Sequence, residues 1–503
     1  MEEPHEIELK FALAPDRAVQ ILAELPPLAG AATEDLTSIY FDTRRQDLKR
    51  AGLALRVRHE DGRYVQTLKA ASESLLMRGE WETALPTPDP APDLLKGTPA
   101  AGVLRKGGDL APQFTIEAKR RSAEVAEGAS RISLSLDEGA ARAGDKSQPF
   151  AELELELKEG PIDGLLSLAR RVSQTGDLTL SFTSKAERGF LLARPPRQRA
   201  LKFAPPPLKP DTPTAEAFQI AASACLRQIV GNAEHLRRRV SPEVLHQLRV
   251  GIRRLRSLIT TFKPVVADGR LPTITDELKW LTGELDAARN LDVMLRGEFR
   301  ASLGQKYEAD GLKALAGRLR DARRIAYARA ASAVEGARFR ELLINLLIWI
   351  ETGPWTIAPK TERARKGKIE RFARQALEKR RRKIVKQAKR FADLDVQARH
   401  KLRIEAKKLR YAADVFSHLF GRPRRVQRFL AQLKRVQDCL GELNDIVVGE
   451  AIAREVAAGA SLAQARAAFA AGWITGARGQ HLDALTAQAE DALKSFADAK
   501  PFW

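Results

Sequence analysis

Two periodicities divide the chain. Over the first 200 residues, apolar and polar residues alternate one by one in about eight short segments, the pattern of half-buried β-strands. The clearest examples are EIELKF (6–11) and FAELELELK (150–158). From residue 214 onward, apolar residues recur every three or four positions, as on amphipathic helices. Between the two patterns, residues 204–213 are proline-rich and typical of a stiff linker.

These patterns predict an α+β protein with two domains. We expect residues 1–203 to form an eight-stranded antiparallel β-barrel that encloses a tunnel, with helices flanking it. Residues 214–503 are expected to form an all-α bundle. The proline-rich residues 204–213 would join the two domains.

A duplicated segment organises the helical part. The sequence HQLRVGIRRLR (246–256) returns as HKLRIEAKKLR (400–410), with five of the eleven positions identical. A repeat at this distance indicates two equivalent structural units. We therefore predict a pseudo-twofold helical bundle whose repeats cover about 214–355 and 356–503.

Each copy predicts a helix with one apolar face and one cationic face. Like charges four residues apart on a helix repel by a few tenths of a kcal/mol, and a purely structural helix would alternate them with glutamate. A solvated basic face is the simpler explanation, but we favour an anion site that is built twice. Its predicted residues are His246, Arg249, Arg253, Arg256, His400, Arg403, Lys407 and Arg410.

A second matched pair of segments lies downstream of each copy. These are LDAARNLDV (285–293) and LGELNDIVV (440–448), which place Arg, Asn and Asp within a helical pattern. We expect such side chains to pair with the cationic stripe and to fix its rotamers, without contacting a ligand themselves.

In the predicted barrel, one face of many strands carries charges of both signs. Glutamates two apart on a strand lie about 7 Å from each other and repel by roughly 2–2.5 kcal/mol at an effective dielectric constant of about 20. Exposure to water would make such rows harmless. If the rows instead share one enclosed space, paired carboxylates bind divalent cations, and Arg and Lys bind phosphate oxygens. The arrangement then predicts a site for a metal–polyphosphate complex.

Charge is distributed unevenly between the two parts. Residues 1–200 hold 28 Lys and Arg against 31 Asp and Glu, whereas residues 201–503 hold 57 against 33. The net charge of +21 therefore belongs to the helical part, and it predicts a polyanionic partner. The two cysteines, Cys225 and Cys439, exclude a disulfide framework and suit a reducing compartment. The acidic start and the absence of a long apolar run predict a cytoplasmic protein that does not bind membranes.

The two histidine- and arginine-containing helices resemble the CHAD domain, a conserved-histidine α-helical domain, over roughly residues 214–503. The resemblance implies a compact helical fold whose basic groove binds inorganic polyphosphate, and it allows a location at polyphosphate granules. Metal chelation by the histidines is disfavoured here, because each is surrounded by cations and lacks a second His or a carboxylate four residues on.

The first 200 residues resemble the CYTH family of triphosphate tunnel metalloenzymes. The ExExK signature is present as Glu6, Glu8 and Lys10 near the N-terminus. Further matches are LRVR (Arg56, Arg58), QTLK (Lys69), ELELEL (Glu152, Glu154, Glu156) and SKAERG (Lys185, Arg188), with Asp137 before a glycine-containing turn. The family's central basic strand position falls in EAKRR, where Lys119 and Arg121 are the two alternatives.

The CYTH resemblance implies a triphosphatase that hydrolyses inorganic tripolyphosphate with Mg²⁺ or Mn²⁺. Glu6 and Glu8 would hold a first metal ion, and the glutamates of ELELEL would hold a second or orient the attacking water. The expected catalytic residues are Glu6, Glu8, Lys10, Lys69, Glu152 and Glu154; the metal ligands are Glu6, Glu8, Glu152, Glu154 and Glu156; the substrate-binding residues are Lys10, Arg56, Arg58, Lys69, Lys119, Arg121 and Lys185.

Three functional classes remain open from the sequence. The first is a triphosphatase tethered to a polyphosphate-binding domain, with thiamine triphosphate or a nucleotide as alternative substrates. The second is a binding protein whose degenerate tunnel only senses polyphosphate. The third is nucleic-acid binding, which we do not expect because the cationic helices carry few aromatic residues for base stacking.

Overall fold

The computed structural model describes residues 5–60, 62–72, 74–105, 108–175, 177–195, 200–296, 309–457 and 482–503, with backbone only at 309–311 and 447–457. These residues form two compact units. One comprises residues 1–201 together with 336–352, and the other comprises residues 202–335 and 353–503. None of the described helices is long and apolar enough to cross a membrane.

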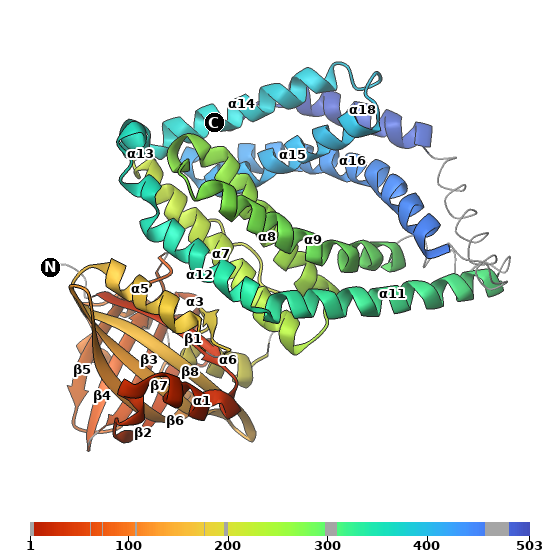
Figure 1. The fold of residues 1–503 in the computed structure, drawn as a ribbon. Coiled ribbons are helices and arrows are strands. Elements are labelled where there is room, and N and C mark those ends of the chain that lie inside the picture. The colour runs from red at the N-terminus through yellow and green to blue at the C-terminus, as the bar shows by residue number, and fades with distance from the viewer. Residues whose placement is uncertain are drawn as a thin grey trace. The chain divides into compact units, whose positions relative to one another are not determined.

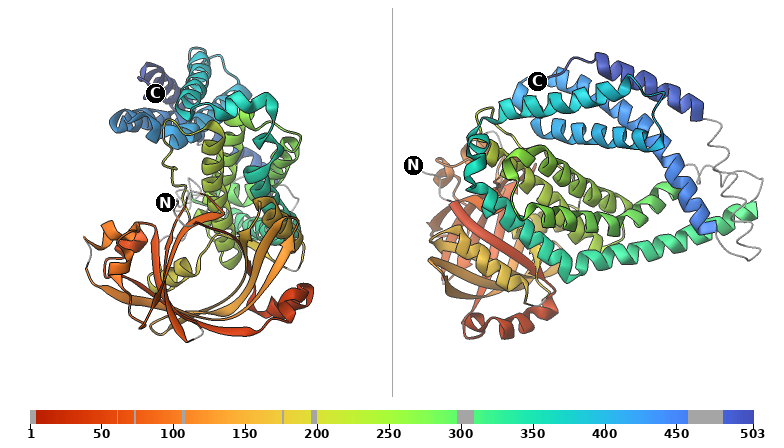
Figure 2. Two further views of the ribbon diagram at one scale, coloured as in Figure 1. Left: turned by 90° about the vertical axis from the view of Figure 1, so that its left-hand side faces the viewer. Right: turned by 45° about the horizontal axis from the view of Figure 1, so that its top comes forward.

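The alternating segments of the first unit pair into one antiparallel sheet that closes on itself. The described strands run in the order β5-β4-β3-β2-β6-β7-β8-β1, and β1 also pairs with β5, so that eight strands make a barrel (Figure 2, left). A short strand, β9, lies beside the second half of β1. The bounds are β1 His5–Leu13, β2 Thr33–Thr43, β3 Leu53–Glu60, β4 Arg63–Ala70, β5 Met77–Leu85, β6 Leu110–Glu127, β7 Ser130–Ala143, β8 Lys146–Glu159 and β9 Thr179–Ser181.

Strand alternation sorts the side chains of the barrel into two layers. On β8, Leu153 and Leu155 point outward and are buried, while Glu152 and Glu154 point inward. The outward leucines lie beneath α5, whose buried face includes Leu165 and other apolar residues. The helices of this unit are α1 Ala18–Glu24, α2 Pro26–Ala29, α3 Asp47–Arg50, α4 Ala100–Leu104, α5 Ile162–Ser173, α6 Lys185–Ala193 and α12 Ala337–Thr352.

An aromatic cluster fills part of the barrel interior next to α6. Tyr40 stacks on Phe114 with 4.7 Å between ring centroids, and Phe190 of α6 meets Phe114 edge-on at 4.9 Å. The helix begins after Ser184, whose hydroxyl accepts a hydrogen bond from the Glu187 amide. Gly189 allows this packing, because a Cβ there would lie 2.0 Å from the Phe114 ring. The cluster thereby fixes α6, which carries two basic residues of the SKAERG segment.

Helix α12 belongs to the barrel unit, although its sequence lies far beyond the linker. It contacts α5 and β9, and the Arg170 guanidinium donates a hydrogen bond of 2.8 Å to the Asn345 side chain. Arg340 forms an ion pair of 3.3 Å with Asp177. Apolar residues cover almost its whole circumference and are buried, as expected for a helix enclosed on all sides.

The helical unit repeats one order of neighbours twice. In the first half α7 contacts α8, α8 contacts α9, α9 contacts α11, and α11 contacts α7; in the second half α14, α15, α16 and α18 make the same four contacts (Figure 1). The duplicated segments lie on α8 and α15, which contact each other. The bounds are α7 Thr214–Arg238, α8 Pro242–Val266, α9 Leu271–Arg296, α11 Ala309–Glu335, α13 Glu362–Lys366, α14 Ile369–Ala388, α15 Val396–Phe416, α16 Pro423–Ala457 and α18 Leu482–Asp498.

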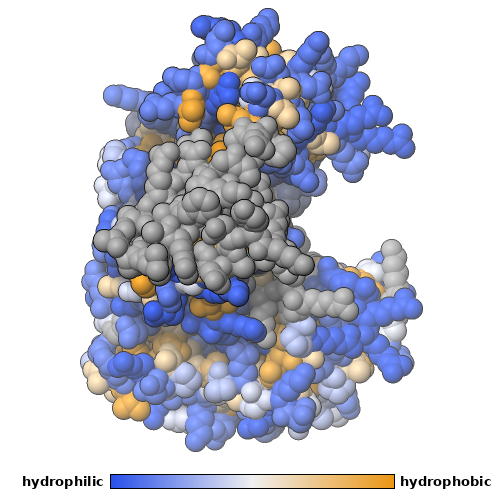
Figure 3. All heavy atoms as spheres, turned by 90° about the vertical axis from the view of Figure 1, so that its right-hand side faces the viewer, coloured by the Kyte–Doolittle hydropathy of each residue, from blue (hydrophilic) through white to orange (hydrophobic). Residues whose placement is uncertain are grey.

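The predicted fold class is confirmed: an eight-stranded antiparallel barrel is followed by a region of many helices. Residues 458–481 of the second predicted repeat lie outside the described residues. In the part of Figure 3 that is coloured, most of the visible surface is hydrophilic, with hydrophobic residues in small groups.

Candidate functional site

The barrel interior is organised around a pair of charges on adjacent strands. The register of β1 and β8 places Lys10 directly opposite Glu154, and 2.6 Å separates Nζ from the carboxylate oxygen. Burial opposes charge on both groups, but their attraction prevails: the pKa of Lys10 is raised, and that of Glu154 is held well below its usual value by Lys10, Lys185 and Arg120. Both groups therefore stay ionised inside the barrel.

The other two residues of the ExExK signature are neutralised from β4 and β5. The Lys69 ammonium lies 2.6 Å from Glu6 and 3.0 Å from Glu80, and Arg78 is ion-paired with Glu8. Although burial opposes ionisation of Glu6, Lys69 and Arg78 lower its pKa to about 2. Glu80, which shares Lys69 with Glu6, has a raised pKa because of its burial.

A second cluster lies toward α6. Arg120 of β6 donates two hydrogen bonds to the buried Asp137, at 2.7 and 2.6 Å, and one of 2.7 Å to Glu154. The Lys185 ammonium lies 2.7 Å from Asp137 and 2.9 Å from Glu154, and it is also ion-paired with Glu152. This cluster holds three carboxylates and two cations within one network.

Most of these groups, though not Asp137 and Glu152, line a cavity of about 290 Å³ in which positive and negative charges balance. The uncharged lining residues are Leu36, Tyr40, Ala54, Ala186 and four serines. The acidic lining residues are Glu6, Glu8, Glu34, Glu60, Glu80, Glu82, Glu154 and Glu156; the basic ones are Lys10, Arg56, Arg58, Lys69, Arg78, Arg120, Lys158 and Lys185.

The structure brings together most of the residues expected in the tunnel and corrects one position. Lys119 and Arg121 do not line the cavity, and Lys119 is exposed, whereas Arg120 between them points inward. The interior face of β6 continues the apolar series Phe114, Ile116, Ala118, so the charged face chosen from the sequence is the outer one. Glu152 also lies apart from the open cavity, buried against Lys185 and Arg188.

The carboxylates suit a divalent metal ion. One oxygen each of Asp137, Glu152 and Glu154 lie within 4.8 Å of one another, and all three side chains are buried or half-buried. Oxygen donors of this type are those that Mg²⁺ and Mn²⁺ prefer. Here Lys185 and Arg120 supply the compensating charge, so a cation that entered would replace ammonium and guanidinium groups in contacts that already exist.

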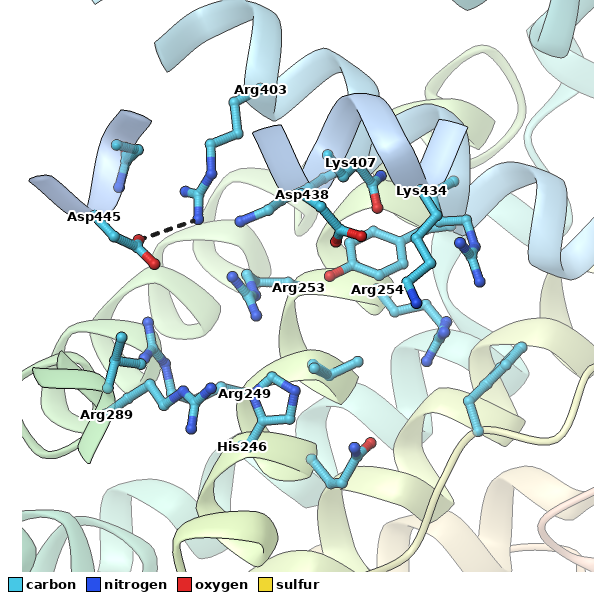
Figure 4. A pocket seen from close by; sticks show the side chains of 18 of the residues that line it. His246, Arg249, Arg253, Arg254, Arg289, Arg403, Lys407, Lys434, Asp438 and Asp445 are labelled. Atoms are coloured by element: carbon cyan, nitrogen blue, oxygen red, sulfur yellow. Dashed lines mark ion pairs between the residues drawn. The ribbon is translucent and has the colours of Figure 1, made fainter. Parts of the chain in front are cut away.

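The helical unit contains a second pocket, of about 690 Å³, between the duplicated helices (Figure 4). Arg249 and Arg253 reach it from α8, and Arg403 and Lys407 reach it from α15. Of the eight residues predicted from the stripe, six line this pocket: His246, Arg249, Arg253, Arg403, Lys407 and Arg410. The repeat therefore brings two cationic faces to one cavity.

The remaining two stripe residues lie outside the lining. The His400 ring shares a hydrogen bond of 2.7 Å with the Asn444 side chain, and Arg256 donates one of 3.4 Å to Thr282. The expected support from the downstream segments is present: Arg249 is ion-paired with Asp286, and Arg403 lies 3.8 Å from Asp445.

Several lining residues were not predicted. Arg289 was expected to act only as support, but it lines the pocket directly. Arg254 is buried behind the stripe, where its guanidinium lies 4.0 Å from the centre of the Phe203 ring and 3.1 Å from Asp414. The signal that could have identified Arg254 is its position directly after Arg253 of the stripe. For Lys202 and Lys434 the sequence offers no comparable signal.

The two sites differ in how their cations are compensated. In the barrel, carboxylates raise the pKa of Lys10 and Lys185 despite burial. In the helical pocket, burial and neighbouring cations lower the pKa of Lys407 to about 7 and that of Arg249 to about 10. His246 is affected in the same way, with its pKa lowered to about 4 by burial and by Arg289. The lining of the pocket thus holds nine Lys and Arg side chains against three carboxylates, so positive charge is in clear excess.

Comparison with known proteins bears on both parts. Residues 4–190 match the model of the CYTH domain, and residues 220–454 match that of the CHAD domain. Over 200 residues the chain is 29% identical to a protein of Haemophilus influenzae named inorganic triphosphatase; the match covers 37% of this chain and 54% of that relative, about half its length.

Two solved structures resemble the chain. The CHAD domain of the plant Ricinus communis is 29% identical, with a TM-score of 0.52 over 60% of this chain and 97% of that one. PptA from Streptomyces chartreusis is 19% identical, with a TM-score of 0.43 over 56% of this chain and 100% of that one.

The barrel with its ring of acidic and basic residues is thus a CYTH domain, and the duplicated helical region is a CHAD domain. The chain is a distant homologue of the inorganic triphosphatase of Haemophilus influenzae through part of its length. CYTH enzymes depend on metal ions, and CHAD domains are associated with polyphosphate.

Proposed function

We propose that the barrel hydrolyses inorganic tripolyphosphate with Mg²⁺ or Mn²⁺ and that the helical pocket binds long-chain inorganic polyphosphate. The observation that carries the first part is the balanced lining of the barrel, with eight acidic and eight basic residues. A free polyanion gains little from a neutral cavity. A metal–phosphate complex offers cations to the carboxylates and oxygens to the basic groups at the same time.

Each set of tunnel residues has a defined task in this proposal. Lys10, Lys69, Arg120 and Lys185 would leave their carboxylate partners and donate hydrogen bonds to phosphoryl oxygens, with Arg56 and Arg58 extending the contact. Their positions are already set by the strands and, for Lys185, by α6, so they would orient the phosphate chain and neutralise its charge without a large rearrangement.

The freed carboxylates would hold the metal. Glu6 and Glu8 form one set, and Asp137, Glu152 and Glu154 form the other. A bound divalent ion supplies Lewis acidity and lowers the pKa of water, so no histidine base is required. Glu156 is half-exposed and paired with Lys158 at 2.8 Å, which makes it a weaker candidate ligand.

The lining also favours an inorganic substrate over an organic one. Tyr40 is the one aromatic residue among those that line the described cavity, and its ring is stacked on Phe114. A thiazole ring or a nucleobase bound in the tunnel would need an apolar or stacking surface. Thiamine triphosphate and nucleotides therefore rank behind tripolyphosphate.

For the helical pocket, the excess of cations over carboxylates in the lining carries the proposal. Burial of several positive groups in one cavity costs free energy that a bound polyanion would recover. The pocket draws on both repeats, so a linear chain could contact α8 and α15 together. Polyphosphate held there would keep substrate near the tunnel within one molecule.

Phosphate release from tripolyphosphate with Mg²⁺ or Mn²⁺, and with EDTA added, tests the enzyme. Arg120→Ala should lower kcat/KM at least 100-fold, while the matched change Lys119→Ala on the outer face should leave it within twofold, since one donor to a reacting phosphate is worth roughly 3 kcal/mol. Binding of tripolyphosphate without release in either metal would favour the degenerate, sensing tunnel. Equal effects of the two variants would refute the assigned site.

A further inference from the structure

One amine of the helical pocket is surrounded by other basic groups. Lys407 of α15 lines the cavity and is half-buried, and among the described residues no carboxylate or hydrogen-bond acceptor pairs with its Nζ atom. Figure 4 shows its side chain among those of Arg403 and Arg253, with Asp438 and Lys434 nearby. The adjacent Lys408, by contrast, lies 2.8 Å from Glu405.

Its surroundings disfavour the protonated amine. Burial has the largest effect, followed by Arg403 on the same helix and Arg253 on α8; Arg249 adds to them, and Asp445 of α16 opposes them. Together they lower the pKa of Lys407 to about 7. At neutral pH about half of this amine is unprotonated, compared with about 0.04% for a lysine with the ordinary pKa of about 10.4.

An unprotonated amine is a nucleophile, and its neighbours select the electrophile. The guanidinium groups of Arg253 and Arg403 attract phosphate dianions, for which Arg is the preferred ligand. An acyl phosphate has such a dianion joined through one oxygen to an electrophilic carbonyl carbon. If the phosphate binds the arginines, the carbonyl is delivered to an amine that lies among them.

We propose that Lys407 is a site of acylation by acyl phosphates, which the cationic pocket recruits through their phosphate group. The Lys407 nitrogen attacks the carbonyl carbon and a C–N bond forms. The C–O bond to phosphate breaks, inorganic phosphate leaves with the electron pair, and the amine proton passes to solvent. The products are an amide at Lys407 and inorganic phosphate, and no oxidant or reductant is required.

Acylation of Lys407 would change how the pocket binds its proposed ligand. An amide cannot become protonated when a polyanion arrives, so acylated Lys407 offers one charge fewer and more bulk. We therefore expect acylation to weaken polyphosphate binding. This consequence depends on the proposed function of the pocket, whereas the reactivity of the amine does not.

The test is incubation of the full-length protein with acetyl phosphate at pH 7, followed by peptide mass spectrometry. Acetylation of Lys407 should proceed at least tenfold faster than that of Lys408, which is ion-paired, and of Lys401, which is exposed on the same helix. Tripolyphosphate in excess should slow the reaction at Lys407 at least fivefold and leave Lys401 unchanged. Acetic anhydride, which is neutral, should also prefer Lys407, but by a smaller factor than acetyl phosphate, because the arginines do not recruit it.

Equal rates at Lys407 and Lys401 with acetyl phosphate would overturn the proposal, as would a preference that tripolyphosphate does not reduce. Titration of the unmodified protein with polyphosphate reports separately on the proposed function. If that titration shows no binding while acetic anhydride still selects Lys407, the pocket's proposed ligand is wrong and the amine's reactivity stands. Lys407→Arg keeps a charge and removes the amine, and it should abolish the fast site.

Discussion

Lys10 and Glu154 face each other across β1 and β8, with 2.6 Å between the ammonium nitrogen and a carboxylate oxygen. The two partners are not equivalent, because Glu154 also accepts hydrogen bonds from Arg120 and Lys185. Loss of the carboxylate leaves three buried cations poorly compensated, whereas loss of Lys10 leaves Glu154 with two partners.

Glu154→Gln should therefore destabilise the protein more than Lys10→Met. Breaking a buried ion pair from one side costs about 3–5 kcal/mol, and we place Glu154→Gln at the upper end. Urea denaturation measures both values. Tripolyphosphate without metal should stabilise Glu154→Gln more than the unmodified protein, since the anion replaces the missing negative charge; a larger loss for Lys10→Met would contradict this assignment.

Glu6 makes stability depend on pH in the acid range. Its pKa in the folded protein is about 2, below the value of 4.5 for the free side chain, so the ionised form contributes stability above pH 4.5 and loses it as the pH falls toward 2. The contribution is about 3 kcal/mol. Denaturant midpoints between pH 5 and 2.5 should fall less steeply for Glu6→Gln than for the unmodified protein. Parallel curves would show that Lys69 and Arg78 do not hold Glu6 as described.

Gly189 does not line the tunnel, but a single methyl group added at this position should disturb it. A Cβ there would lie 2.0 Å from the Phe114 ring, so Gly189→Ala must displace α6 and with it Lys185. We expect a loss of about 1–3 kcal/mol of stability from overpacking and at least a tenfold loss of kcat for tripolyphosphate. Gly102→Ala in α4, where nothing lies within 4 Å, is the matched control; it should leave kcat unchanged and should not lower stability, since Ala is the better helix former.

Polyphosphate binding by the helical unit should weaken steeply with salt. Each neutralised phosphate contact releases counterions, so the slope of log affinity against log salt concentration reflects the number of cations engaged. Arg253→Gln, within the pocket, should reduce that slope by about one. Arg382→Gln on α14, an exposed position paired with Glu378 and absent from the pocket lining, should leave it unchanged. Fluorescence titrations from 50 to 400 mM salt give both slopes.

Local periodicity predicted the barrel well, because inward and outward positions on a strand alternate without exception over short distances. It placed Glu6, Glu8 and Lys10 correctly in the interior of β1, together with Arg56, Lys69 and Glu154 on other strands. It failed at EAKRR, because three consecutive basic residues do not show which of them face the interior of the barrel. The phase of β6 is set by Phe114 and the aromatic cluster around α6, a tertiary contact that alternation does not reveal.

Helical spacing had a similar limit. It placed Arg249, Arg253 and Lys407 in one pocket, but it chose one stripe on each helix, whereas residues beside the stripe also line the cavity. Arg254 and Arg289 therefore joined the site from positions assigned to other faces. Which flank of a helix lines the pocket depends on contacts between helices of different repeats. These contacts cannot be predicted from the residue pattern of one helix.

Helix α12 affects how the barrel unit can be separated from the rest of the chain. The barrel unit includes residues 337–352, which follow most of the first helical repeat in the gene. A gene fragment ending at the proline-rich segment would encode α5 without the helix that meets Arg170 there. A truncation meant to isolate the barrel unit would thus lack one of its helices, and α12 would have to be supplied together with residues 1–201.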